Sequence, residues 1–238
     1  MSLNIQSELE IKKGKLLVVF PHPDDETVMT AGLILRALKL GWQVRVLIVT
    51  NGGRGKIFIH GNGRSATEIR LDELSKAMRV LRVADWKCGG FEDARLKNTS
   101  SWQKWVGKEL EDFNPDLVVS YGPGGVTGHP DHIALSKFLY ELLSKSKWQY
   151  WGVSPVGWGR RFFVHHHFVK TLLVGASLVC LNWSEVWLKW RSVMVYKSQM
   201  QLFKRLNLLW YWSIERCEGY VELKTKDNLI YKYVEFKV

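Results

Sequence analysis

The stretch Leu16-Leu-Val-Val-Phe-Pro-His-Pro-Asp-Asp-Glu26 decides the fold class of this chain. Its first five residues form a short, continuous apolar run, as expected for a fully buried strand, and the run ends at Pro21-His22-Pro23. Residues 27–40 carry apolar side chains at helical spacing, and Gly41 suits the end of a helix. A buried strand that leads directly into a helix is the first half of a βαβ unit.

The same alternation of strand and helix continues to about residue 155. Further strands are predicted over residues 43–50, 86–88, 116–121 and 149–154, and further helices over residues 66–81, 101–113 and 133–143. This pattern predicts a Rossmann-like, mostly parallel α/β sheet flanked by helices. The last third predicts a C-terminal extension, with a helix or helix pair over residues 184–217 and a strand pair in residues 219–238 that turns near residue 226. No repeat or composition break divides the chain, so we expect one domain over residues 1–238.

Composition limits the classes of protein to consider. The 238 residues are 46% apolar and 24% charged, which excludes a disordered, collagenous or coiled-coil chain. A net charge of +11 favours acidic partners such as nucleic acid, phosphates or an anionic membrane surface. The chain begins with polar and acidic residues, and its longest apolar stretch, residues 171–183, is too short to span a bilayer. Because Cys88, Cys180 and Cys217 are odd in number and form no CxxC pair, we predict no disulfide framework and a reducing, cytoplasmic location.

Two turns that contain His-Pro-Asp are the most informative motifs. The first is PHPDDE at residues 21–26, and the second is HPDH at residues 129–132. Each follows a predicted buried strand and precedes a predicted helix. In doubly wound sheets, ligands bind beyond the carboxyl ends of the strands, at the point where the strand order reverses. With the common strand order 3-2-1-4-5, both turns would open on one crevice.

His22, Asp25 and His132 are the candidate metal ligands in this crevice. Imidazole and carboxylate are ligands that zinc accepts, commonly three from the protein with a fourth position left for water. Residues three apart at the start of a helix return to the same side, so His22 and Asp25 can reach one ion together. Two histidines and one carboxylate also suit ferrous iron. We favour zinc because hydrolysis needs no redox metal.

Asp24, His129 and Asp131 remain for proton transfer and charge stabilisation. Asp24 lies between two ligands and should point towards the water at the fourth metal position, where a carboxylate can act as general base. His129, kept charged by Asp131, would stabilise an oxyanion or protonate a leaving amine. One metal, one base and one acid are what amide hydrolysis requires.

The paired turns resemble those of the LmbE-like (PIG-L) superfamily of zinc-dependent N-acetylglucosaminyl de-N-acetylases. That superfamily carries an (A/P)HPDD(E) turn near its N-terminus and an HPDH turn past the middle. Arg70-Leu-Asp-Glu73 resembles its R-x-x-E helix, Lys197-Ser-Gln199 its late SQ motif, and Glu215 its late glutamate. The chain has Thr127-Gly128 where some members place Tyr or Arg, and Tyr196 where a histidine is common.

The resemblance implies the same site that the residues suggest. It makes His22, Asp25 and His132 zinc ligands and Asp24 the general base. It makes His129, oriented by Asp131, the acid or oxyanion partner. For either turn alone, the simpler interpretation is a helix N-cap, because Asp and Pro are favoured there for backbone reasons.

We therefore predict a zinc hydrolase that removes an acetyl group from an N-acetylated amino sugar or a small, anionic sugar conjugate. Arg54 and Arg95 are candidate contacts to a substrate phosphate. One alternative is a zinc amidase acting on another N-acyl or thiol conjugate. The other is a basic α/β nucleic-acid-binding module without catalysis, which charge alone favours.

The C-terminal third carries further interpretations. The run His165–His167 is expected in a surface or partly packed strand, because consecutive side chains point to opposite faces. Trp183, Trp187 and Trp190 recur at helical spacing, as the packing stripe of a buried helix face would. This tryptophan-rich part could also supply a homo-oligomer contact or a lipid-facing surface.

Overall fold

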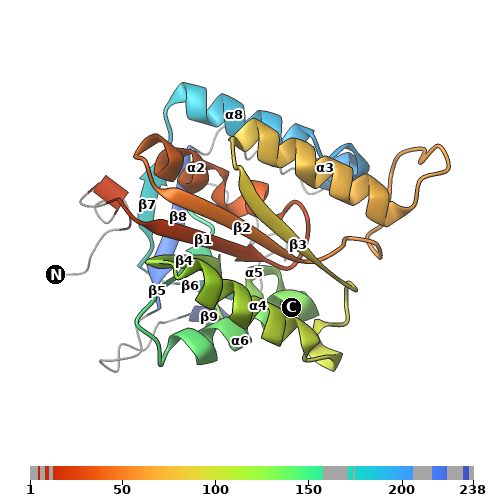
Figure 1. Ribbon diagram of the computed structural model, residues 1–238. Helices are drawn as coiled ribbons and strands as arrows, with labels where there is room; N and C mark the ends of the chain where they lie inside the picture. Colours follow the sequence, from red (N-terminus) through yellow and green to blue (C-terminus); the bar gives the residue numbers. More distant parts are fainter. Residues whose placement is uncertain are drawn as a thin grey trace.

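The computed structural model describes residues 5, 9–10, 13–157, 171–173, 175–205, 216–223 and 233–235. A seven-stranded sheet runs through these residues in the order β3-β2-β1-β4-β5-β8-β7 (Figure 1). Five strands are parallel: β1 (Lys15–Phe20), β2 (Gln43–Thr50), β3 (Asp85–Phe91), β4 (Leu117–Tyr121) and β5 (Gln149–Ser154). The antiparallel strands β8 (Cys217–Glu222) and β7 (Ser177–Cys180) complete one side. The predicted Rossmann-like, mostly parallel sheet is thereby confirmed.

The strand order reverses between β1 and β4. From β1 the chain continues outward through β2 and β3, and it then returns to pair β4 directly with β1, so that Val18 lies opposite Val119. A crevice therefore opens beyond the carboxyl ends of β1 and β4, where ligands bind in sheets of this kind. The two His-Pro-Asp turns begin at this edge.

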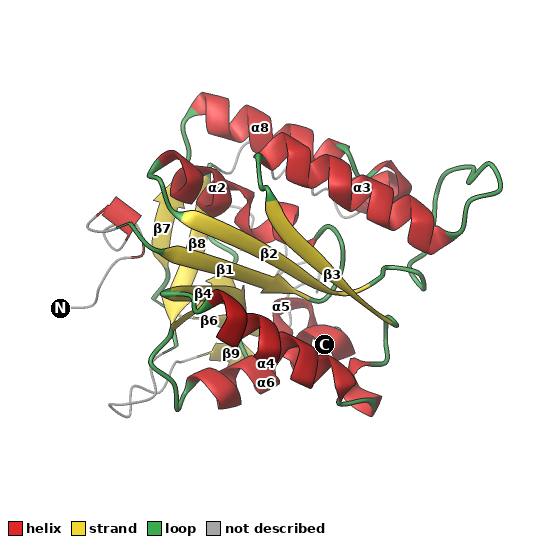
Figure 2. Cartoon of the chain, viewed as in Figure 1, coloured by secondary structure: helices red, strands yellow, loops and turns green. Residues whose placement is uncertain are grey.

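Helices cover both faces of the sheet and enclose two apolar cores. One face carries α2 (Asp25–Lys39), α3 (Ala66–Leu81) and α8 (Trp183–Met194); the other carries α4 (Ser101–Phe113) and α6 (Pro130–Leu143) (Figure 2). The central strand supplies both cores by alternation: Leu16 and Val18 belong to one cluster, and Leu17 and Val19 to the other. Because β1 is buried on both faces, its residues 16–20 form a continuous apolar run.

Short elements complete the structure. They are η1 (Leu96–Asn98), α5 (Gly125–Gly128), η2 (Lys197–Gln199), α9 (Met200–Arg205) and a small antiparallel sheet of β6 (Thr171–Leu173) and β9 (Tyr233–Glu235). Capping boxes fix the starts of α3, through Ser65 and Glu68, and of α8, through Asn182 and Glu185. These caps explain why the helix predicted over residues 66–81 begins where it does.

The C-terminal strand pairing differs from our prediction. Strand β8 does not form a hairpin with β9; it lies between β5 and β7, while β9 pairs with β6. The predicted helix to residue 217 was also wrong at its end, because Cys217 begins β8. Alternation of side chains indicates a strand but not its partner, and here the partners are distant in sequence.

The prediction that the chain has no disulfide is wrong as well. Cys180 and Cys217 are directly opposed on β7 and β8 and form a disulfide, whereas Cys88 is free. The two cysteines lie 37 residues apart. Only the non-local pairing of the strands brings them together, and nothing in their spacing signals it.

The tryptophan stripe is not a packing stripe. The exposed fractions of Trp183, Trp187 and Trp190 are 68%, 55% and 40%. The buried side of α8 instead carries Glu185 and Lys189, whose charges are paired with other elements of the fold. The run His165–His167 lies outside the described residues. None of the helices in the described part of the chain is long and apolar enough to cross a bilayer.

Candidate active site

The first turn joins β1 to α2 through a strained residue. Asp24 occupies the N-cap position of α2 with φ 113° and ψ −32°, a conformation that side-chain-bearing residues rarely adopt and that costs about 1–3 kcal/mol. Its carboxylate does not cap the helix. Instead, Asp24 Oδ2 accepts a hydrogen bond from the Arg70 guanidinium on α3 at 3.0 Å. The simple N-cap interpretation therefore fails for this turn.

The second turn is an ordinary helix start. His129 is the N-cap of α6, its Nδ1 accepts a hydrogen bond from the Asp131 amide at 3.2 Å, and Pro130 occupies the first helical position. The fully buried Asp131 carboxylate accepts hydrogen bonds from the amides of Ala94 at 2.5 Å and Leu96 at 3.1 Å. This carboxylate thus ties the turn to the loop after β3.

Three side chains from the two turns converge on one point. His22 Nδ1 lies 3.2 Å from His132 Nε2 and 3.4 Å from Asp25 Oδ2, and His132 Nε2 lies 3.5 Å from the same Asp25 oxygen. Donors bound tetrahedrally to zinc at about 2.0–2.2 Å are separated by about 3.3–3.6 Å. The residues predicted from the sequence therefore present donor atoms of the type and spacing that zinc requires.

His129 also lies close to this group. Suitable ring nitrogens of His22, His129 and His132 all lie within 4.8 Å of one another, so three imidazoles form an alternative ligand set. The hydrogen bond to Nδ1 of His129 argues against it. Because Nδ1 accepts from the Asp131 amide, the proton of a neutral His129 ring resides on Nε2, which is then a donor rather than a ligand.

In His22 and His132, the surrounding acceptors place the ring proton on the nitrogen that faces away from the convergence point. His22 Nε2 lies 3.1 Å from Asp131 Oδ2, so its proton belongs on Nε2 and its Nδ1 lone pair faces the convergence point. His132 Nδ1 lies 3.2 Å from the Gly125 carbonyl oxygen, which leaves the Nε2 lone pair facing the same point. Both tautomers are those of metal-ligating histidines oriented by an outer acceptor.

The role of the Asp131 carboxylate differs from our prediction. We expected it to orient His129, but it contacts His22, and only the Asp131 main chain reaches His129. The pKa of His129 is lowered, because burial and the nearby His22 outweigh the effect of Asp131. The prediction that Asp131 keeps His129 charged is therefore not supported by the structure. The reason is the direction of the carboxylate, which sequence spacing does not reveal.

Two residues that the sequence analysis missed hold the ligands in place. Tyr121, the last residue of β4, stacks on the His132 ring at 4.3 Å and donates a hydrogen bond to Asp25 Oδ1 at 2.7 Å. Gly125 has φ +65°, and a Cβ there would lie 2.8 Å from the His132 Cβ, so only glycine fits so close to this ligand. A tyrosine that ends a buried strand and a glycine in a loop carry no chemical signal in the sequence.

Burial and ion pairing shift the pKa values of the ligands in opposite directions. Burial lowers the pKa of His132 to about 4. Burial also acts to lower the pKa of His22, but hydrogen bonds to Asp131 and Asp25 prevail and raise it to about 10. Without a metal the His22 ring is therefore protonated at neutral pH, and a metal bound at Nδ1 would displace that proton. For Asp25, burial acts to raise the pKa, yet His132 and His22 hold it below the usual range. Asp25 is therefore a carboxylate, as a metal ligand must be.

Two further carboxyl groups lie beside the ligands in a buried network. Burial raises the pKa of Asp24 to about 6, although Arg70 opposes this shift. Burial also raises the pKa of Glu26 to about 8, and its Oε1 accepts a hydrogen bond from the Tyr196 hydroxyl at 2.6 Å. Carboxyl groups with strongly shifted pKa values are typical of catalytic sites.

The Arg70–Glu73 motif links Asp24 to the Ser198–Gln199 segment. Arg70 donates hydrogen bonds to Asp24 and to the Pro23 carbonyl, while Glu73 accepts from both the amide and the hydroxyl of Ser198. Arg70 sits at a buried position of α3, where the periodicity calls for an apolar residue. In the sequence, a charged residue at a position that the helical periodicity places on the buried face is the signal that indicates a functional role for Arg70. Glu215 lies outside the described residues.

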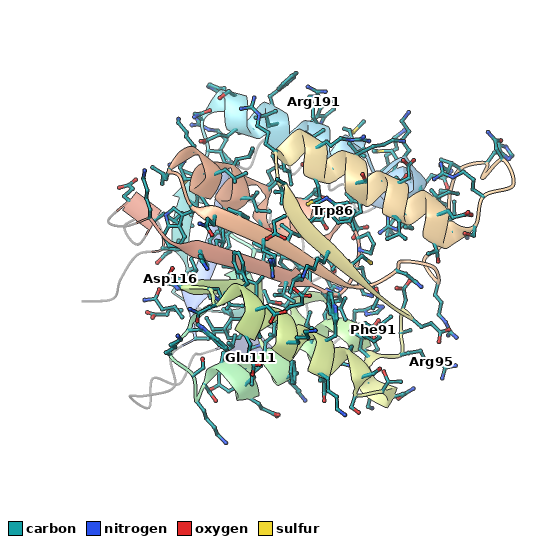
Figure 3. All side chains as sticks on the ribbon, viewed as in Figure 1. Trp86, Phe91, Arg95, Glu111, Asp116 and Arg191 are labelled. Carbon is teal, nitrogen blue, oxygen red and sulfur yellow. A yellow bond between two sulfur atoms is a disulfide. The ribbon has the colours of Figure 1, made fainter. Side chains whose placement is uncertain are left out.

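Arg54 and Arg95 converge on a single glutamate at the rim. Arg54 lies 2.5 Å and Arg95 3.7 Å from Glu92, and each arginine side chain is 49% exposed. Figure 3 labels Arg95 at the edge of the molecule, away from the helices of the other layer. The loop that carries it reaches the site, because the neighbouring Ala94 amide donates to Asp131. The arginines are thus near the crevice but are paired rather than directed into it.

The fold and the site together define a Rossmann-like α/β protein with a candidate metal centre at the switch point of its sheet. Residues 17–143 match the PIG-L family, described as GlcNAc-PI de-N-acetylase. This range covers more than half of the 238 residues and includes both turns, and the chain belongs to this family.

Curated relatives share parts of the sequence. A 1D-myo-inositol 2-acetamido-2-deoxy-alpha-D-glucopyranoside deacetylase from Mycobacterium sp. (strain JLS) is 30% identical over 179 residues, which are 63% of this chain and 58% of the relative. A probable N-acetyl-alpha-D-glucosaminyl L-malate deacetylase 2 from Bacillus anthracis is 34% identical over 136 residues, 54% of this chain and 59% of the relative. The matches span less than two thirds of these relatives.

Solved structures share the fold. A deacetylase from teicoplanin biosynthesis superposes with a TM-score of 0.69 in its bog complex and 0.67 in its zinc-inhibited form. Each match has 18% identity and covers 90% of this chain and 99% of the other. GalB, a 4-carboxy-2-hydroxymuconate hydratase from Pseudomonas putida, matches with a TM-score of 0.67 at 15% identity, covering 92% and 100%. Since both a deacetylase and a hydratase use it, the fold alone does not fix the reaction.

Proposed function

We propose that this protein is a zinc-dependent de-N-acetylase that hydrolyses the acetamide of an N-acetylated amino sugar or sugar conjugate. The observation that carries the proposal is the triangle of His22 Nδ1, Asp25 Oδ2 and His132 Nε2, with sides of 3.2–3.5 Å. The deacetylase names of the relatives support the reaction class, and the zinc-inhibited form of one structural neighbour is consistent with zinc binding in this fold. The acetamide in both relatives' names supports an N-acetylglucosaminyl substrate.

Zinc, when bound, supplies Lewis acidity for an acyl carbonyl and a water molecule. Proton transfer and stabilisation of the oxyanion are the tasks of residues of the chain. Asp24 accepts the proton of the attacking water, and its raised pKa of about 6 lets it hold and release that proton near neutral pH. The ion pair with Arg70 at 3.0 Å orients the Asp24 carboxylate, whose residue has the unusual φ of 113°.

His129 acts as the hydrogen-bond donor on the other side of the crevice. The Asp131 amide donates a hydrogen bond to its Nδ1, so that the Nε2–H can donate a hydrogen bond to the developing oxyanion. A neutral ring fits this role, since the pKa of His129 is lowered by burial. Water and the acetamide thereby yield acetate and the amine, with the proton passing from the water through Asp24 to the amine.

The chain's charge and rim suggest the kind of substrate. The net charge of +11 and the two arginines beside Glu92 favour a small anionic conjugate, with Arg54 and Arg95 as the proposed contacts. A zinc amidase acting on a different N-acyl or thiol conjugate would use the same centre. A cytoplasmic location stays a prediction, and the Cys180–Cys217 disulfide removes the argument from cysteine usage on which it partly rested.

A substrate panel tests the proposal. The purified chain is incubated with N-acetylglucosamine, N-acetylglucosaminyl inositol, N-acetylglucosaminyl malate and an N-acylated thiol conjugate, and released primary amine is measured. Each reaction is run with added zinc, after chelation, and after zinc is returned. We expect amine release from an N-acetylglucosaminyl compound that chelation abolishes and zinc restores. Chelator-resistant release, or none from any compound, would contradict the proposal.

A further inference from the structure

Helix α8 has an unusual distribution of side chains. The spacing of Trp183, Trp187 and Trp190 places them on one face, and this face is the exposed one. The opposite face is buried, although it carries Glu185 and Lys189. A surface helix of a folded domain normally shows the reverse pattern, with apolar residues inside and charges outside. We call the three exposed tryptophans the indole face.

The inversion is a built feature of the fold rather than loose packing. Glu185 pairs with Arg36 of α2 at 2.9 Å, and Lys189 pairs with Glu218 of β8 at 2.6 Å. These ion pairs anchor α8 against the body of the protein, where it contacts α2 and α3 and forms an outer edge of the molecule (Figure 1). The indole face is therefore held outward by the other side of the same helix, where Val193 enters the apolar core beside the two ion pairs.

The exposed charges around the indole face have one sign. Within residues 182–204, the exposed charged side chains are Arg191, Lys197 and Lys204. Two arginines lie on the indoles themselves, Arg191 at 4.7 Å from the Trp187 ring centre and Arg216 at 4.8 Å from that of Trp183. Arg191 is labelled on α8 in Figure 3. Residues 182–204 and Arg216 thus combine large aromatic area with positive charge, and Asp72 of the neighbouring α3, which lines a pocket with Arg191, is paired with Lys76 and Arg64.

We propose that the indole face, with Arg191 and Arg216, docks the protein on the surface of an anionic lipid bilayer. Indole rings prefer the boundary between headgroups and acyl chains, where their apolar area is buried and their N–H stays solvated. Each basic residue near such a surface adds attraction to anionic headgroups. A helix that lies in the plane of the interface on an aromatic face with basic neighbours meets both conditions.

A second copy of the chain is a poorer occupant for this surface. In a twofold contact centred on the indole face, the same patch would meet itself, so Arg191 and Arg216 would approach like charges on the other copy. Among the exposed residues 182–204 there is no acidic side chain to offset them. Charge complementarity therefore favours an anionic partner.

Vesicle flotation of the full chain tests the proposal. Vesicles of phosphatidylcholine alone are compared with vesicles containing about one third phosphatidylglycerol, at low and high salt. We expect binding to the anionic vesicles that high salt weakens, since exposed charges are screened. A triple variant, Trp183→Ser, Trp187→Ser and Trp190→Ser, should lose at least about tenfold in partitioning. Because these side chains are exposed, its thermal melt should match that of the parent.

A matched pair of charge variants isolates the role of the arginines. Arg191→Gln with Arg216→Gln should weaken anionic binding about tenfold or more. Lys104→Gln with Lys108→Gln removes the same charge from exposed positions of α4, on the opposite layer, and should leave binding nearly unchanged. Equal effects of the two pairs would show attraction by net charge alone and would overturn the proposal.

Three other outcomes would also overturn it. They are equal binding to neutral and anionic vesicles, binding that survives the triple variant, and a dimer in sedimentation velocity that the triple variant dissolves while vesicles are not bound. Retarded nucleic acid in a gel, lost in the triple variant without any vesicle binding, would assign the face to that partner instead. Deacetylation of a water-soluble substrate should be unchanged in these variants. The docking proposal can therefore fail while the proposed function stands.

Discussion

The two His-Pro-Asp turns place the same tripeptide at different positions relative to the helix that follows. In the first turn, α2 begins at Asp25, so Asp24 falls at the N-cap. In the second, α6 begins at Pro130, so His129 is the N-cap and Asp131 lies within the first turn of the helix. A shift of two residues gives the two aspartates unlike surroundings.

Because of this shift, Asp24 and Asp131 differ in backbone strain and in the groups that they contact. Asp24 has a left-handed backbone and reaches Arg70, whereas Asp131 has ordinary helical surroundings and holds His22 together with two backbone amides. Strain of this kind persists at functional sites when the surrounding structure enforces it. The comparison therefore supports different tasks for the two aspartates: proton transfer for Asp24 and positioning of His22 for Asp131.

The largest expected effect comes from removing a ligand. His132→Ala should reduce the zinc content from about one ion per chain to near zero and abolish deacetylation, because three protein donors are needed for tight binding. His129→Ala should keep the zinc and lose only turnover. Elemental analysis after gel filtration measures both. Zinc loss in His129→Ala with retention in an Asp25→Ala variant would favour the three-histidine set.

Substitution of Asp24 and of Asp131 should have different effects on turnover and on zinc affinity. Asp24→Asn should retain zinc but lower kcat by about 10²–10⁴-fold, because the general base is gone. Asp131→Asn should lower zinc affinity by about 10–100-fold, because an amide is a weaker acceptor for His22 and its NH2 group would face a donor. Turnover at saturating zinc and a zinc titration with a competing chelator separate the two results. Similar zinc affinities in both variants would contradict the proposed difference between the two aspartates.

A backbone substitution beside the second turn should have an intermediate effect. Gly125→Ala places a Cβ at 2.8 Å from that of His132 and at φ +65°, so we expect a loss of about 1–3 kcal/mol in stability together with weaker zinc binding. Gly63→Ala shares a positive φ of +82° but has nothing within 4 Å of the added Cβ. This control should lose only about 1 kcal/mol and leave zinc affinity unchanged. Thermal melts and zinc titration of both variants provide the test.

The smallest effects are expected at the rim. Arg54→Ala and Arg95→Ala remove half-exposed ion pairs with Glu92, so stability should change by less than about 1 kcal/mol. For an anionic substrate KM should rise severalfold, with kcat unchanged, because only substrate binding is weakened. The zinc content should stay as in the parent, since the Ala94 amide still supports Asp131. An unchanged KM in both variants would remove these arginines from the substrate contacts.

The sequence predicted the parts of the fold that depend on local patterns. The strands and helices over residues 43–50, 66–81, 101–113 and 149–154 coincide with β2, α3, α4 and β5. Apolar periodicity, caps and turn residues determine such elements within one short segment. The convergence of His22 and His132 was also foreseen, because the switch point of a parallel sheet follows from strand order.

The remainder depended on contacts between distant segments. The disulfide of Cys180 with Cys217 and the pairing of β8 arise from strand neighbours that no local pattern specifies. The outward face of α8 depends on contacts of its other side with distant segments, including the Lys189–Glu218 ion pair and Val193 in the core. The direction of the Asp131 carboxylate likewise depends on the loop after β3.

The most direct measurement is zinc-edge anomalous diffraction from crystals grown with about one equivalent of zinc. The account predicts one strong peak at about 2.0–2.2 Å from His22 Nδ1, Asp25 Oδ2 and His132 Nε2, with His129 Nε2 and the Asp24 carboxylate left out of the coordination shell. A peak coordinated by His129 in place of Asp25, or one outside the two turns, would contradict it.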